Sequence, residues 1–170
     1  MRCLRLLCVG ALATVLAGCA GYRLGPTNGV SAGARSVRIT PFTNKTLMPQ
    51  LSENVMNSLR KNLQRDGTYH VETHEDGDII LSGVITDYQR TELSLQPADV
   101  LTVLDYQITM TAQVTARERA TGKIILNRAV IGRTSIRAGN DLTSAERQAM
   151  PLLTDDLAKK TTALLVDGTW

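Results

Sequence analysis

Residues 104–116 read LDYQITMTAQVTA, and this alternating stretch decides the fold. Over its 13 residues, each apolar side chain is followed by a polar one. Because successive side chains of a β-strand point to opposite faces, one face of this strand is apolar and the other carries mainly Thr and Gln. The pattern predicts a long strand with one buried face and one face that meets water or a polar partner.

Further strands are predicted on both sides of this stretch. Short alternating runs at 37–39 and 69–71 indicate two brief strands, and a longer one is expected from 79 to about 95. After it, the glycine-containing turn at 120–123 leads into an alternating run at 124–137. Long strands joined by so short a loop predict an antiparallel hairpin.

A first amphipathic helix is expected between Met48 and Asp66. Its apolar residues recur every four positions, and charged residues occupy the other faces. Pro49 is typical of a first helical turn, and Gly67 is typical of a helix end.

A second helix is expected towards the C-terminus. Thr143 and Glu146 have the spacing of a capping box, and a leucine-rich stripe follows. Pro151 lies inside this stripe, so we expect a kink there or a helix that restarts at the proline. The elements together predict an α+β fold: a two-layer sandwich with a mostly antiparallel sheet of four to five strands and two helices packed on one face.

The N-terminus has the layout of an export signal. Leu6 to Ala17 is an uncharged apolar run of 12 residues behind Arg2 and Arg5, too short to span a bilayer. Leu-Ala-Gly directly before Cys19 resembles the lipobox of bacterial lipoproteins, in which the cysteine becomes the acylated first residue. The alternative is an ordinary cleaved signal followed by a chance cysteine.

These features divide the chain into three expected parts. Residues 1–18 form a lipoprotein signal peptide, residues 19–35 a lipidated N-terminus and glycine-rich tether, and residues 36–170 a single domain. Several acyl chains, palmitate among them, would hold Cys19 firmly in a membrane, whereas one chain binds only marginally. In enterobacterial lipoproteins an Asp after the cysteine resembles an inner-membrane retention signal, so Ala20 predicts the outer membrane.

Net charge and aromatic content argue against a nucleic-acid-binding protein, and the cysteine positions argue against a disulfide-bonded domain. The net charge of +3 falls to +1 when Arg2 and Arg5 leave with the signal, and only 4% of residues are aromatic. Both values argue against binding to a nucleic acid. Cys3 and Cys8 would leave as well, so the mature chain would form no internal disulfide.

No catalytic arrangement is found in the sequence. Cys19 would be acylated, and His70 and His74 lie in an extended segment that separates their side chains. Asp155 and Asp156 are adjacent on a helix and point in different directions. Phosphate-binding and hydrolase motifs are also absent from the sequence. We therefore expect no enzyme activity, no metal and no cofactor.

Arginines provide the candidate ligand site. Those at 128, 133 and 137, with two more across the hairpin, are expected to form a basic strip at one end of the sheet, and guanidinium groups suit phosphates. The alternative is a set of solvated edge charges that prevents aggregation between sheets. The five residues are Arg117, Arg119, Arg128, Arg133 and Arg137.

Five segments together resemble the LptE family of lipopolysaccharide-assembly lipoproteins. The shared features are an aromatic residue after the lipidated cysteine, a P-F-x-N-x-T loop, a helix, a strand opened by an aspartate and a T-G-K turn. The segments are CAGYRL (19–24), SVRITPFTNKTLMPQLSENVMNSLRKNL (36–63), GDIILSGVITDYQRTELS (77–94), ARERATGKIIL (116–126) and LAKKTTALLVDGTW (157–170).

The resemblance implies an outer-membrane lipoprotein that plugs the β-barrel LptD, assists its assembly and binds lipopolysaccharide, with Cys19 as its anchor. It also implies two helices against a four-stranded sheet. The strand ending in P-F-x-N also occurs in other envelope lipoproteins, so the alternative is a lipoprotein that binds a peptidoglycan synthase or a secretion pore.

Overall fold

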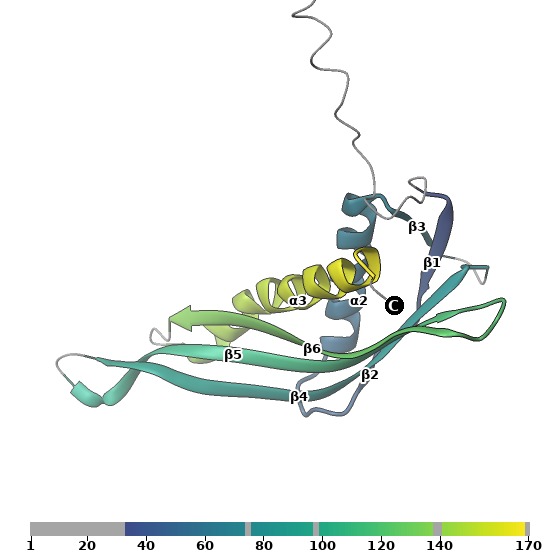
Figure 1. Ribbon diagram of the computed structural model, residues 1–170. Helices are drawn as coiled ribbons and strands as arrows, with labels where there is room; N and C mark the ends of the chain where they lie inside the picture. Colours follow the sequence, from purple (N-terminus) through teal and green to yellow (C-terminus); the bar gives the residue numbers. More distant parts are fainter. Residues whose placement is uncertain (1–32, 74–75, 97–98, 138–140, 169–170) are drawn as a thin grey trace, which may run out of the picture.

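Figure 1 shows the computed structural model, which describes residues 33–73, 76–96, 99–137 and 141–168. The expected signal peptide and Cys19 lie outside these ranges. In the described part of the chain, no helix is long and apolar enough to cross a membrane. The elements in chain order are β1 (Arg35–Ile39), β2 (Thr43–Asn44), α2 (Leu51–Asp66), β3 (Tyr69–Glu72), β4 (Ile79–Gln96), β5 (Asp99–Glu118), β6 (Ile124–Arg137) and α3 (Leu142–Val166).

The strands form one mixed sheet of six strands in the order β3-β1-β4-β5-β6, with β2 paired to β4. The expectation of four to five mostly antiparallel strands is therefore only partly correct. β1 pairs in parallel with both β3 and β4, and β2 is also parallel to β4. Helix α2 lies between β1 and β3 in the chain, and such a crossover connects parallel strands.

The stretch that decides the fold is the centre of β5. Its apolar side chains are fully buried from position 108 onward, at Ile108, Met110, Ala112, Val114 and Ala116. The β5 strand pairs antiparallel with β4 on one side and with β6 on the other. The predicted antiparallel hairpin is confirmed, and so is the predicted burial of one face from Ile108 onward.

Both helices lie on the same side of the sheet (Figure 1). Each of the four apolar residues at spacing four in α2 is at most 1% exposed: Leu51, Val55, Leu59 and Leu63. Gly67 ends α2 in the left-handed conformation, as predicted, with φ of 75°. A polar contact joins the two helices: Asn62 Nδ2 of α2 donates to Asp155 Oδ1 of α3 over 2.8 Å.

The start of α3 differs from the prediction. Asp141, not Thr143, is the N-cap, and its side chain accepts from the backbone N–H of Ser144 over 3.1 Å. Glu146 is thus free to bond Tyr88 from β4. Helix α3 also runs through Pro151 without restarting.

Close packing joins α3 to the edge strand β6. A Cβ added to Gly132 would lie 2.8 Å from the backbone oxygen of Leu153 and 2.9 Å from the Leu157 side chain. Only glycine permits this distance, so Gly132 allows α3 to rest on the backbone of β6.

Candidate functional site

The five arginines of the predicted strip do not lie together. Arg117 and Arg119 lie at the end of β5 and in the turn that follows, whereas the other three follow one another along β6. Arg128 and Arg137 are separated by about 30 Å along the strand, because a strand rises about 3.3 Å per residue. The burial pattern of β6 places Arg133 and Arg137 on the face without helices and Arg128 on the opposite face.

Two of these arginines have acidic partners. Arg137 Nε lies 3.2 Å from Asp105 Oδ1, and Arg119 Nη1 lies 3.1 Å from Asp76 Oδ1. The guanidinium of Arg133 forms no ion pair within the described ranges, and its residue is exposed. Ligand binding by the five arginines stays a prediction, and Arg133 is, with Arg117 and Arg128, one of three exposed members without an ion pair among the described residues.

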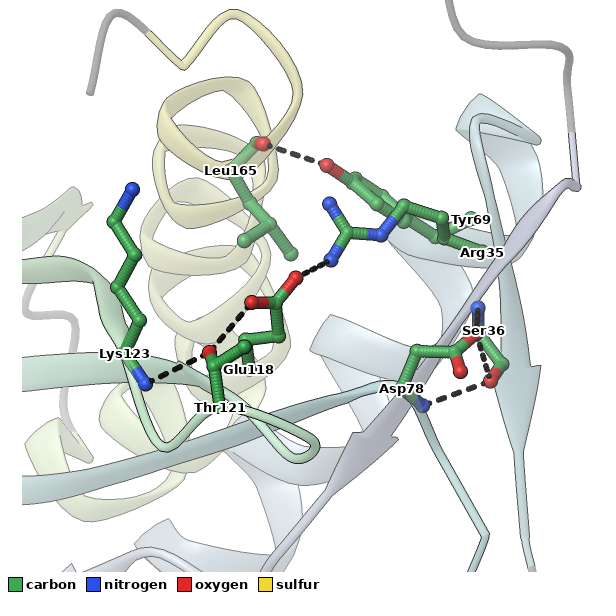
Figure 2. Close-up of polar contacts among 8 residues, drawn as sticks. All are labelled: Arg35, Ser36, Tyr69, Asp78, Glu118, Thr121, Lys123 and Leu165. Atoms are coloured by element: carbon green, nitrogen blue, oxygen red, sulfur yellow. Dashed lines mark hydrogen bonds and ion pairs between the residues drawn. The ribbon is translucent and has the colours of Figure 1, made fainter.

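A cluster of polar side chains lies where the first strand begins, and we call it the tether-proximal cluster (Figure 2). Arg35 Nη2 donates to Glu118 Oε1 over 2.5 Å. The hydroxyl of Thr121 donates to the second oxygen of the same carboxylate over 2.6 Å. Asp78 Oδ2 accepts from the backbone N–H of Ser36 over 2.9 Å and from its hydroxyl over 3.0 Å. The start of β1 is thereby tied both to β4 and to the β5–β6 turn.

Hydrogen bonding favours the ionised form of both carboxylates of the cluster. The backbone N–H and the hydroxyl of Ser36 lower the pKa of Asp78 below its usual value. The hydroxyl of Thr121, with Arg35, lowers the pKa of Glu118. A cavity of about 520 Å³ beside them is also lined by Arg119, so side chains of both charge signs line it. This arrangement suits an anchoring role, because both Glu118 oxygens and Asp78 Oδ2 accept from local donors.

Sequence reasoning did not find this cluster. Asp78 and the turn at 120–123 were recognised only as parts of motifs. Arg35 and Glu118 are 83 positions apart, so no local pattern could pair them. The single local signal is Gly122, whose φ of 70° marks the turn that brings Thr121 back to the strand end.

The face of the sheet that carries no helix is a broad polar surface, which we call the helix-free face. Its central row is formed by Thr109, Thr111, Gln113 and Thr115 of β5, all partly exposed. Gln113 Nε2 donates to Asn127 Oδ1 of β6 over 2.6 Å, so part of this surface is held in a fixed geometry. Uncharged donors and acceptors of this kind can bind a polar wall, a sugar or water.

A cavity of about 750 Å³ lies between the outer edge of β6 and the C-terminal part of α3. Leu126, Val130 and Leu164 give it an apolar lining. Arg128 and Lys160 add two cationic groups. The cavity contains one of the five predicted arginines and is separate from the helix-free face.

The described side chains provide no metal site. No group of three or more His, Cys, Asp or Glu residues is placed to hold an ion in this part of the chain. His70 has a 67% exposed side chain on β3, and its Nε2 lies 3.5 Å from Glu72 Oε1.

The family model described as lipopolysaccharide-assembly, LptE, matches residues 34–163. The chain belongs to the LptE family. The match begins beside the tether-proximal cluster and includes every described strand, so the predicted family is confirmed for most of the domain. No curated protein sequence matches the chain.

Solved structures share the fold of this LptE-family chain. A hypothetical protein from Chlamydia trachomatis has a TM-score of 0.59 at 12% identity, covering 81% of this chain and 98% of that one. A protein from Xanthomonas campestris has a TM-score of 0.60 at 8% identity, covering 85% and 91%. A minor lipoprotein from Acinetobacter baumannii has a TM-score of 0.53 at 14% identity, covering 78% and 93%. Identities this low establish a common fold alone.

Proposed function

We propose that this LptE-family protein is an outer-membrane lipoprotein that forms, with an LptD-type β-barrel, the translocon that assembles lipopolysaccharide at the cell surface. It acts there as a barrel plug, as an aid to barrel assembly and as a lipopolysaccharide binder. The observation that carries the proposal is the family match over residues 34–163. The role requires no enzyme activity and no cofactor.

The proposed anchor is an acylated Cys19 exposed by removal of residues 1–18. Residues 20–35 would then connect the membrane to the domain, which faces the periplasm and the barrel lumen. The tether-proximal cluster supports this arrangement, because it fixes the first residues of β1 to two other parts of the sheet.

The helix-free face supports the plug role. The inner wall of an outer-membrane barrel is polar, in contrast to its lipid-facing side. The row of Thr and Gln on β5 offers donors and acceptors to such a wall without adding unpaired charge. The helices on the other side keep the apolar core closed while the sheet contacts the partner.

The exposed guanidinium of Arg133 supports lipid binding. It lies on the helix-free face, at the strand position opposite Thr109. Guanidinium groups bind phosphate oxygens through paired hydrogen bonds, and lipopolysaccharide carries phosphorylated sugars.

Detergent extraction and affinity purification of the lipidated full-length protein test the proposal. Mass spectrometry should find an outer-membrane β-barrel in roughly equal amount. The variant Cys19→Ala, expressed at the same level, lacks the proposed anchor. Comparing the barrel that it recovers with the barrel that the wild type recovers identifies contacts that depend on the anchor. Recovery of a peptidoglycan synthase, or of a self-associated ring without a barrel, would reject the proposal in favour of the alternative.

A further inference from the structure

The P-F-x-N-x-T segment at 41–46 contains β2, and the loop that runs from it to α2 is fixed at its base. Phe42 is 2% exposed and packs directly on β4. A Cβ added to Gly83 would lie 2.3 Å from the Phe42 ring, so glycine is required beneath it. The backbone oxygen of Phe42 also accepts from the Ser52 hydroxyl over 2.6 Å, which ties the loop to α2.

Asn44 organises the rest of the loop. Its Nδ2 donates to the backbone oxygen of Met48 over 2.6 Å. Its Oδ1 accepts from the backbone N–H of Thr46 over 2.9 Å and from the Thr46 hydroxyl over 2.8 Å. Gln50 then adopts a left-handed conformation with φ of 62°, which is uncommon for a residue other than glycine. The backbone from 44 to 50 is thus held in one shape.

The residue that this loop presents is Leu47, which is 103% exposed. The next most exposed large apolar residue among those described is Leu152, at 63%. Single exposed leucines are ordinary on protein surfaces. Leu47 differs because the loop on which it stands is fixed by side-chain hydrogen bonds on both sides of it.

The surroundings of Leu47 have the form of a docking site. Leu47 lines a cavity of about 280 Å³ together with Met48 and Tyr88, and polar groups lie on the same cavity at Lys45, Thr86 and Asp87. The β2 strand ends its pairing with β4 at Ile85, and from Asp87 onward the described part of β4 pairs with β5 alone. In Figure 1 the loop reaches past β4, at the opposite edge of these strands from α3. An apolar anchor with a polar rim is the usual centre of a protein interface.

We propose that Leu47 is a contact residue for the barrel protein and that its side chain enters an apolar socket within that partner's otherwise polar inner wall. This inference rests on the proposed function, which supplies the partner. A lipid surface fits less well, because membrane binding needs a broad apolar face and one leucine with a charged neighbour does not provide it. The rigid loop suits a preformed socket, because no ordering is needed on binding.

Co-purification of the barrel with Leu47→Ser, compared with the wild type, tests the inference. We expect about tenfold less barrel with this variant, as for an interface hot spot. Leu152→Ser makes the same chemical change at another exposed leucine, and its barrel recovery should stay at the wild-type level. Thermal melting of both variants should match the wild type, because both side chains are largely exposed.

Photocrosslinking identifies the neighbour of Leu47 directly. A benzophenone amino acid at position 47 should yield an adduct with the mass of the barrel, and the same probe at 152 should yield much less. Three outcomes would overturn the inference and leave the barrel partnership intact. Leu47→Ser could recover as much barrel as the wild type, or both serine variants could lose barrel equally. The probe at position 47 could also form an adduct with a second copy of this chain. If the wild type itself recovers no barrel, the proposed function fails and this inference fails with it.

Discussion

Asp78 joins the first strand of the domain to the central strand β4. Its carboxylate accepts two hydrogen bonds from Ser36, and its own backbone N–H donates to the Ser36 hydroxyl over 2.9 Å. These contacts lie at the start of β1, the first strand of the described residues. Asp78 therefore tests how firmly β1 is held to the start of β4.

Asp78→Asn should lower the free energy of unfolding at pH 7 by at most about 1 kcal/mol, because the contact is exposed to solvent. The folded-state pKa of Asp78 lies below the unfolded value of 3.8. Its stabilising effect is therefore full above that value and is lost as the pH falls through the lowered pKa. Urea unfolding of wild type and variant should show a gap in the free energy of unfolding at pH 7 that narrows at a pH well below 3.8. A gap of equal size at both pH values would show that ionisation of Asp78 is not involved.

At the scale of elements, β6 is an edge strand whose backbone groups are partly covered by α3. Asp156 Oδ2 accepts from the backbone N–H of Arg133 over 2.8 Å. Lys160 Nζ donates to the backbone oxygen of Ile131 over 2.9 Å and pairs with Asp156 over 2.6 Å. Unpaired strand edges are templates for aggregation, so these two side chains protect the sheet.

Lys160→Ala should increase self-association while changing the free energy of unfolding by less than about 1 kcal/mol. Lys159→Ala is the matched control, since Lys159 also pairs with an aspartate four residues earlier, Asp155, over 2.8 Å. Of these two lysines, Lys160 also bonds the β6 backbone. Light scattering at increasing concentration measures the difference. Equal behaviour of the two variants would contradict edge protection by Lys160.

The elements also show what the sequence could predict. Strict alternation was enough to place β5, because its period is local and unambiguous. The parallel pairing of β1 with β3 and β4 was missed, because strand partners far apart in the chain leave no local pattern. The N-cap was misplaced by two residues, since Asp141 and Thr143 both have suitable side chains and only the packed helix selects one.

For the arginines, a local signal was overlooked. Arg128 and Arg133 are five residues apart in one strand, so the alternation of β6 alone places them on opposite faces. The exposure of Leu47 was also missed, because its cause is a set of hydrogen bonds centred on Asn44 rather than a periodic pattern.

The whole molecule has two unlike sides. The helices and their buried contacts occupy one side of the sheet, and the helix-free face with Arg133 occupies the other. If the helix-free face lies against a polar lumen wall, a lipid phosphate in that space can reach Arg133 without disturbing the core. Arg137 is less available, because its guanidinium pairs with Asp105.

Arg133→Glu should therefore weaken binding of lipopolysaccharide by about tenfold, since it removes a charge-assisted hydrogen bond and adds repulsion. Lys61→Glu, an equal charge change at an exposed position of α2, is the control for net charge and should bind like the wild type. Binding to labelled lipopolysaccharide in detergent, measured at two salt concentrations, separates a local contact from general attraction, because screening reduces the latter more strongly. Circular dichroism should give the same melting temperature for both variants. Equal weakening by both changes would assign the binding to net charge, and unfolding of Arg133→Glu would make Arg133 a structural residue.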